Sequence, residues 1–208
     1  MIPAKPDPVG DPINEAPVVN LPNVLTLLRL LCVPVFIALY MASHDSIVMG
    51  WAADIVFLAA ALTDIVDGHL ARRDGLVTNF GKIADPIADK LLTGSALIAL
   101  SIDGAIAWWI TILIISREVF ITALRFYVIR RGVIPASRGG KAKTASQITA
   151  IVAVLIPTAS LKASPVVPDF LVWLQTAVVN VALVLAVVLT VVTAIDYIAK
   201  SRALLRQS

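Results

Sequence analysis

Four aspartates stand in two pairs within a short stretch of the chain. Asp64 and Asp67 are three residues apart, and Asp85 and Asp89 are four apart. On a helix, each spacing places both carboxylates one turn apart on the same face. The connection between the two pairs is short, so we expect two antiparallel neighbouring helices whose four carboxylates converge on one point.

Four carboxylates in a small space repel one another, and cations or protons must neutralise them. Oxygen ligands without His or Cys favour hard divalent cations, and two Mg²⁺ or Mn²⁺ ions would balance the four charges. Two such ions suit phosphoryl transfer, because they can hold a diphosphate and its leaving oxygen. Gly68, Ala71 and Gly81 leave room for a nucleotide beside the acids, and Arg72 offers donors to a phosphate.

The composition predicts that these acids lie in a membrane protein. Of 208 residues, 59% are hydrophobic and 15% are charged, whereas about 25% are charged in an average soluble domain. This excludes a disordered chain and argues against a soluble domain or a nucleic-acid-binding one. The single Cys32 excludes an internal disulfide, and its apolar surroundings predict a packing role.

Apolar stretches predict an all-α integral membrane protein with six transmembrane helices. A span needs about 20 residues, and Pro157 should kink or stop the fifth one. We expect a six-helix domain over residues 23–200, between a proline-rich cytoplasmic tail (1–22) and a basic cytoplasmic C-terminus (201–208). The six predicted spans are residues 24–43, 47–71, 82–102, 106–130, 145–161 and 170–198.

Basic residues in the loops predict the orientation of the chain. Twelve lie on the side that holds both termini, and the opposite loops hold only Lys162. The positive-inside rule then places both termini, and the carboxylate ends of the second and third spans, in the cytoplasm. We expect the protein to lie in a bacterial-type inner (plasma) membrane. The twelve are Lys5, Arg72, Arg73, Lys82, Arg130, Arg131, Arg138, Lys141, Lys143, Lys200, Arg202 and Arg206.

Two non-catalytic roles for the four aspartates compete with a catalytic one. As satisfied charges in a helical bundle, they would pair with Arg72, Lys82 or Lys90. As the ion site of a cation transporter, they would need to lie near the midplane with access from both sides. Four aspartates at paired helical spacing, beside glycines and at the cytoplasmic ends of the spans, favour a catalytic site over both.

The complete pattern is D-x₂-D-G-x₂-A-R-x₈-G-x₃-D-x₃-D, from Asp64 to Asp89. It resembles the signature of the CDP-alcohol phosphatidyltransferases at every fixed position. The resemblance implies six transmembrane helices, a site that faces the cytoplasm, a homodimer and two metal ions. It also implies transfer of a phosphatidyl group from CDP-diacylglycerol to an alcohol, with release of CMP.

The same resemblance implies roles for individual residues. The implied metal ligands are Asp64, Asp67, Asp85 and Asp89, and Asp89 is also the implied catalytic base that takes the proton of the attacking hydroxyl. The implied CDP-diacylglycerol site consists of Asp67, Gly68, Ala71, Arg72 and Gly81.

Three further segments bear on the identity of the acceptor alcohol. N-L-P-N-V-L-T-L-L-R (Asn20–Arg29), S-R-E-V-F-I-T-A-L-R (Ser116–Arg125) and the segment Gly132–Thr144 resemble the phosphatidylglycerophosphate synthases, which implies glycerol 3-phosphate as acceptor. We expect Pro22, Asn23, Thr26 and Arg29 of the first segment to shape the entrance at the membrane surface.

Basic residues in the second and third segments agree with a phosphorylated acceptor. Arg117 and Arg125 are eight apart on one face of the fourth span, and Arg138, Lys141 and Lys143 gather in an expected loop with two glycines. We expect the acceptor phosphate to bind Arg117, Arg138, Lys141 and Lys143. Inositol phosphate remains an alternative acceptor, because it carries a phosphate too. Other basic residues at the cytoplasmic ends are expected to set topology and contact anionic membrane lipids.

Overall fold

The computed structural model describes residues 20–73, 79–128, 138–156 and 168–206. Within these ranges the structure does not describe the side chains of residues 22, 64–73, 79, 80, 82, 83, 125–128, 138–141 and 202–206. The described part of the chain is all-helical and contains no strand. The predicted all-α fold is therefore confirmed.

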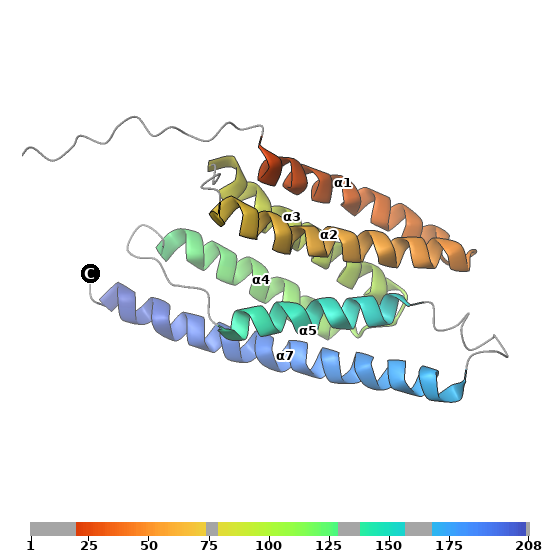
Figure 1. The fold of residues 1–208 in the computed structure, drawn as a ribbon. Coiled ribbons are helices and arrows are strands. Elements are labelled where there is room, and N and C mark those ends of the chain that lie inside the picture. Colours follow the sequence, from red (N-terminus) through yellow and green to blue (C-terminus); the bar gives the residue numbers. More distant parts are fainter. Residues whose placement is uncertain (1–19, 74–78, 129–137, 157–167, 207–208) are drawn as a thin grey trace, which may run out of the picture.

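Six helices make up the described chain, and successive helices run in opposite directions (Figure 1). As a result α1 begins, and α7 ends, at the same end of the bundle. The helices are α1 (Leu21–Ala42), α2 (Ile47–Arg73), α3 (Asn79–Ile102), α4 (Trp108–Val128), α5 (Arg138–Leu155) and α7 (Asp169–Arg206).

The helices pack as two groups that share one core. α1 lies along both α2 and α3, while α7 lies along α5 and also contacts α4. Phe36, Phe57, Leu92, Leu97 and Ile151 are buried in the core between them. These apolar side chains come from α1, α2, α3 and α5.

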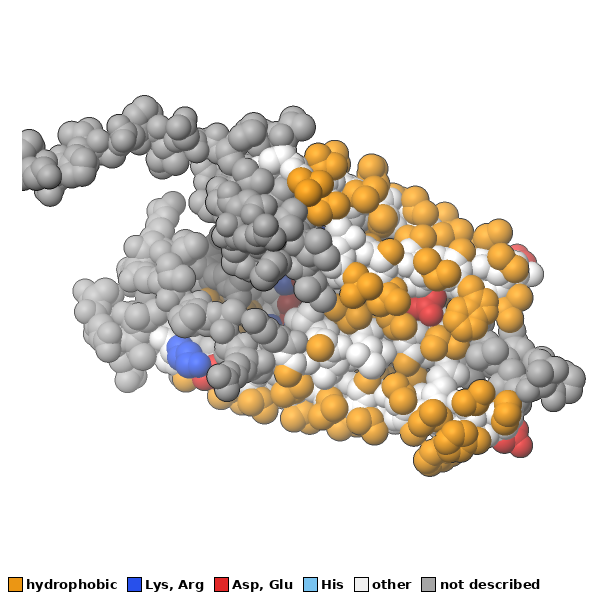
Figure 2. All heavy atoms as spheres, in the orientation of Figure 1, with side chains coloured by type: hydrophobic (Ala, Val, Ile, Leu, Met, Phe, Trp, Pro, Cys, Tyr) orange, Lys and Arg blue, Asp and Glu red, His pale blue; other side chains and the backbone are white. Residues whose placement is uncertain are grey.

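The outer surface of the bundle is apolar. Figure 2 shows hydrophobic side chains spread along the helices with few charged ones among them. Ile55, Val181 and Ile195 are about three-fifths exposed, at 65%, 59% and 63%. Two helical segments, Asn23–Ala42 and Asp169–Ser201, are long and apolar enough to cross a membrane. An apolar exterior on this scale is unfavourable in water and favourable in lipid, as expected of a membrane protein.

All four tryptophans lie near the same end of the bundle. Trp51 is in the second turn of α2, Trp108 and Trp109 begin α4, and Trp173 is in the second turn of α7. Their exposure runs from 40% to 64%, and Trp173 stacks on Phe170. This aromatic end is opposite the end where α1 begins and α7 finishes.

The structure differs from the sequence prediction most clearly at α5. The helix begins at Arg138 and ends at Leu155, whereas the sequence predicts a span over 145–161. The end agrees with the predicted effect of Pro157, because a residue that precedes proline is disfavoured in helical geometry. The start shows that the predicted loop around Gly139 and Gly140 is wrong, since these residues form the first turn of α5.

Candidate active site

Each predicted aspartate pair lies on a single helix. α2 carries Asp64 and Asp67, and α3 carries Asp85 and Asp89. The structure does not describe the side chains of α2 beyond Thr63. The roles expected for Asp64, Asp67, Gly68, Ala71 and Arg72 therefore lie outside the described side chains. Gly81, in the first turn of α3 and one turn before Asp85, is buried.

A hydroxyl group on α1 fixes the carboxylate of Asp85. Thr26 is fully buried, and its Oγ1 donates a hydrogen bond to Asp85 Oδ1. The Asp85 side chain itself is partly exposed, as is that of Asp89 one turn later. The buried Thr26 hydroxyl therefore orients one oxygen of Asp85, while part of the carboxylate remains exposed.

The rest of the polar segment at the start of α1 is also directed into the bundle. Asn20 caps the helix, because the Asn23 backbone N–H donates to its Oδ1 at 2.9 Å. Arg29, only 1% exposed, donates from Nε to the carbonyl of Ala60 on α2 at 3.4 Å. The expected place of Asn23, Thr26 and Arg29 at a surface entrance is therefore wrong. Thr26 and Arg29 link α1 to the two helices that carry the aspartates.

The oxygen donors of α3 fit a hard divalent cation. Asp85 and Asp89 are one turn apart and partly exposed, and Thr26 holds the first of them. Among the described side chains, no three His, Cys, Asp or Glu residues are close enough to hold a metal ion. The expected set of four carboxylate ligands also includes Asp64 and Asp67. These two residues lie on α2, where the structure does not describe their side chains.

A cluster of three cations surrounds one carboxylate beside these aspartates. Glu118 on α4 accepts hydrogen bonds from Lys90 Nζ on α3 at 2.9 Å, from Arg117 Nη1 at 2.9 Å and from Lys143 Nζ on α5. We call Lys90, Arg117, Glu118 and Lys143 the cation cluster. Its side chains are 5–25% exposed. Such burial removes much of the screening by water, so the charges interact strongly.

Two contacts tie the cation cluster to its surroundings. Lys90 Nζ lies 3.9 Å from Asp89 Oδ2, which joins the cluster to the carboxylate expected to act as the base. Arg117 Nη2 donates to Thr193 Oγ1 on α7 at 2.8 Å. The cluster thus brings together α3, α4, α5 and α7.

The structure describes the side chains of two residues of the predicted acceptor site. Arg117 and Lys143 both contact Glu118. Arg138 and Lys141 have side chains outside the described residues. Both residues lie at the start of α5, the helix that also carries Lys143.

Sequence reasoning missed the roles of Glu118 and Lys90. Along the chain Glu118 is only a neighbour of Arg117, and Lys90 is only a possible structural partner of the aspartates. A charged residue inside an apolar span must find partners in the protein interior. That rule applied to Glu118 and Lys90 together would have predicted their ion pair.

The chain matches a known family model over residues 19–192, described as CDP-alcohol phosphatidyltransferase. The match extends from α1 into α7 and includes both aspartate pairs and the cation cluster. The chain belongs to the CDP-alcohol phosphatidyltransferase family. It is therefore an enzyme, a phosphatidyltransferase of phospholipid synthesis.

Curated relatives carry names from one branch of the family. The chain is 46% identical over 196 residues to a "Probable phosphatidylglycerophosphate synthase" of Mycobacterium tuberculosis, covering 92% of this chain and 86% of the relative. It is 40% identical over 200 residues to a "CDP-diacylglycerol--glycerol-3-phosphate 3-phosphatidyltransferase" of Bacillus subtilis, covering 91% and 98%. A Rickettsia typhi protein of the latter name is 40% identical over 133 residues, covering 64% and 74%.

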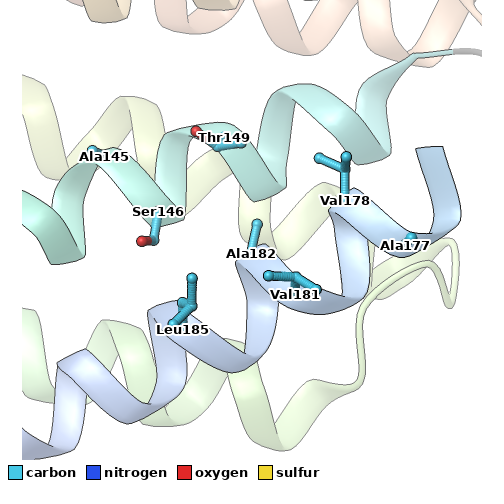
Figure 3. A pocket seen from close by; sticks show the side chains of 8 residues that line it. All are labelled: Ala145, Ser146, Thr149, Ala177, Val178, Val181, Ala182 and Leu185. Atoms are coloured by element: carbon cyan, nitrogen blue, oxygen red, sulfur yellow. The ribbon is translucent and has the colours of Figure 1, made fainter. Parts of the chain in front are cut away.

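This CDP-alcohol phosphatidyltransferase also has an apolar groove between α5 and α7. Figure 3 shows it between α5 and α7, with Ser146 and Thr149 on one side and Val181 and Leu185 on the other. Its volume is about 450 Å³, and no charged side chain lines it. The groove therefore offers no charged group to a phosphate or a metal ion.

Proposed function

We propose that the enzyme transfers the phosphatidyl group of CDP-diacylglycerol to glycerol 3-phosphate, giving phosphatidylglycerophosphate and CMP. One observation carries the choice of acceptor. The ammonium group of Lys90 lies 3.9 Å from Asp89 and 2.9 Å from Glu118, so it connects the proposed base to the cation cluster. The names of the relatives from M. tuberculosis and B. subtilis support the same reaction.

The two neighbouring centres match the two ends of a small phosphorylated alcohol. One short molecule could place its hydroxyl group at Asp89 and its phosphate group at the cation cluster. Arg117 and Lys143, with Arg138 and Lys141 at the start of α5, would bind the phosphate, because lysine and arginine donate charge-assisted hydrogen bonds to its oxygens. An alcohol without a phosphate would not balance the positive charge that these residues carry beyond the charge of Glu118.

Asp89 acts as the general base in the proposed reaction. Its carboxylate takes the proton of the acceptor hydroxyl while the hydroxyl oxygen bonds to the β-phosphorus of CDP-diacylglycerol. The bond between that phosphorus and the bridging oxygen breaks, and CMP leaves with the electron pair. Arg72 and the small residues Gly68, Ala71 and Gly81 would hold the cytidine diphosphate part, and Asp67 would contact it as well.

Asp64, Asp67, Asp85 and Asp89 would hold two Mg²⁺ or Mn²⁺ ions. When bound, these ions supply charge stabilisation for the diphosphate and its leaving oxygen. Thr26 would keep Asp85 in position for this purpose through its hydrogen bond.

We further infer that all six helices cross the bacterial inner membrane with both termini and the active site in the cytoplasm. Tryptophans gather at one end of the bundle, as they do at a membrane–water interface. The opposite end carries most of the basic residues, as cytoplasmic loops do. In this arrangement residues 23–200 form the membrane domain, residues 1–22 form a cytoplasmic tail and residues 201–208 form a basic C-terminus. We also propose that two copies of the chain form a homodimer.

The proposed reaction is tested by product identification. Purified protein in detergent is mixed with CDP-diacylglycerol, glycerol 3-phosphate and Mg²⁺, and lipids and nucleotides are measured by mass spectrometry. Phosphatidylglycerophosphate and CMP should form in equal amounts, and EDTA should abolish both. CMP formed together with phosphatidic acid, without incorporation of the acceptor, would show hydrolysis and contradict the proposal.

A further inference from the structure

Glu118 is the centre of the cation cluster and the one carboxylate within it. It accepts from Lys90 and Arg117 at 2.9 Å each and also from Lys143. The three cations come from α3, α4 and α5, and the Glu118 side chain is 15% exposed. Three cations brought this close would repel one another without an anion between them.

The cation cluster keeps hydrogen-bond donors for a further anion. Each lysine ammonium has three donors and the guanidinium has five, and Glu118 uses only some of them. Arg117 Nε is buried and has no hydrogen-bond partner among the described residues. The cluster's three cations and one carboxylate leave an excess of two positive charges, which Asp89, 3.9 Å from Lys90, partly offsets. A phosphate monoester carries nearly two negative charges at neutral pH, since its second pKa is about 6.

We propose that Glu118 is a positioning residue that holds Lys90, Arg117 and Lys143 together as the binding site for the acceptor phosphate. The inference rests on the proposed function, because it assigns the cation cluster to the phosphorylated acceptor. Glu118 does not touch the reacting atoms. It acts through the three cations, and the contact of Arg117 with Thr193 holds this array from the α7 side.

Positioning and simple charge repulsion predict opposite effects for the loss of the Glu118 charge. A carboxylate near a bound phosphate repels it, so removal of the charge alone would tighten acceptor binding. Loss of the anchor would let the cations separate and weaken acceptor binding. The sign of the change in acceptor KM therefore distinguishes the two roles.

The test compares Glu118→Gln with wild type in steady-state assays that vary glycerol 3-phosphate and CDP-diacylglycerol separately. Loss of charge-assisted hydrogen bonds should raise the acceptor KM about tenfold or more, while KM for CDP-diacylglycerol stays within about twofold. Asp196→Asn serves as the matched control, because Asp196 pairs with Lys200 at 2.7 Å on the exposed side of α7 and should change neither value.

Glu118→Asp keeps the charge and tests the proposal if Glu118→Gln does not fold. Its shorter side chain cannot reach all three cations, so the acceptor KM should rise by less than in Glu118→Gln, about threefold to fivefold. An unchanged or lowered acceptor KM in folded variants, with normal wild-type activity, would overturn the Glu118 proposal alone. Absence of any glycerol 3-phosphate-dependent CMP release by wild type would overturn the proposed function and this inference with it.

Discussion

One ammonium group stands between the two carboxylates that matter most for the proposed reaction. Lys90 Nζ contacts Glu118 at 2.9 Å and approaches Asp89 to 3.9 Å. Lys90 thus links the proposed base to the proposed acceptor site.

Asp89→Asn removes the proposed base while keeping the size of the side chain. General-base catalysis contributes about a hundredfold or more to rate, so turnover should fall by at least that factor. The protein should still elute as a single species and still bind CDP-diacylglycerol. CMP release measures turnover, and isothermal titration measures binding of CDP-diacylglycerol. The control is Asp196→Asn, because Asp196 is a partly exposed residue of α7 that pairs with Lys200. Near-normal turnover in Asp89→Asn would exclude the base assignment.

The first helix organises the site although it carries none of the four aspartates. Thr26 donates to Asp85 on α3, and Arg29 donates to the Ala60 carbonyl on α2, one turn before Asp64. α1 also lies along both of these helices. The polar residues at its start therefore connect α1 to both helices that carry the aspartates.

Thr26→Val removes the hydroxyl that orients Asp85 and keeps the side-chain volume. A hydrogen bond to a charged group is worth about 1.5 kcal/mol or more, so Mn²⁺ affinity should fall roughly tenfold. Titration of Mn²⁺ followed by electron paramagnetic resonance measures this without turnover. The control is Thr176→Val, since Thr176 Oγ1 donates only within α7, to the Val172 carbonyl at 2.9 Å. Equal affinities in the two variants would show that Thr26 does not position a metal ligand.

The turn between α1 and α2 is tied to the end of α3 by a histidine. His44 Nδ1 lies 3.0 Å from the Met41 carbonyl, and Nε2 lies 3.0 Å from Asp103 Oδ2. The hydrogen bond to the Met41 carbonyl, and then the charge of Asp103, raise the pKa of His44 above its usual 6.5. Protonation of His44 therefore favours the folded protein.

This contribution should be complete below pH 6.5 and disappear as the pH rises through the raised pKa of folded His44. His44→Gln should lower the melting temperature at pH 5.5 and leave it unchanged at about pH 9. Because His44 is exposed to solvent, the difference should be small and should shrink further in high salt. Thermal unfolding of both proteins across this pH range measures it. A difference that grows with pH would contradict the assigned sign.

The extent of successful prediction differs between elements for physical reasons. Long apolar runs and one-turn acid spacing predict α1 to α4 and the aspartate pairs, because both signals are local along the chain. At the start of α5 the sequence predicts a loop, because two adjacent glycines disfavour a helix, yet the first turn of α5 forms there. The Glu118 contacts join three helices, and such long-range pairing leaves no local pattern in the sequence.

The whole molecule presents a basic end and an aromatic end on either side of an apolar band. The proposed orientation can be tested by labelling single cysteines in intact cells, after Cys32→Ala removes the native thiol. Asp45→Cys, in the turn after α1, should react with a membrane-impermeant maleimide from outside. Gln207→Cys, beyond the end of α7, should react only after permeabilisation. The reverse pattern would place the aspartates on the outer side of the membrane.

An acceptor competition tests most directly whether this enzyme uses a phosphorylated alcohol. Purified wild-type protein, CDP-diacylglycerol and Mg²⁺ are incubated with equal concentrations of glycerol 3-phosphate, inositol phosphate, serine and glycerol, and the lipid products are resolved by mass spectrometry. We predict that phosphatidylglycerophosphate dominates and that glycerol, which lacks the phosphate, gives no detectable product. A lipid made mainly from serine or glycerol would contradict the assignment of the cation cluster to an acceptor phosphate.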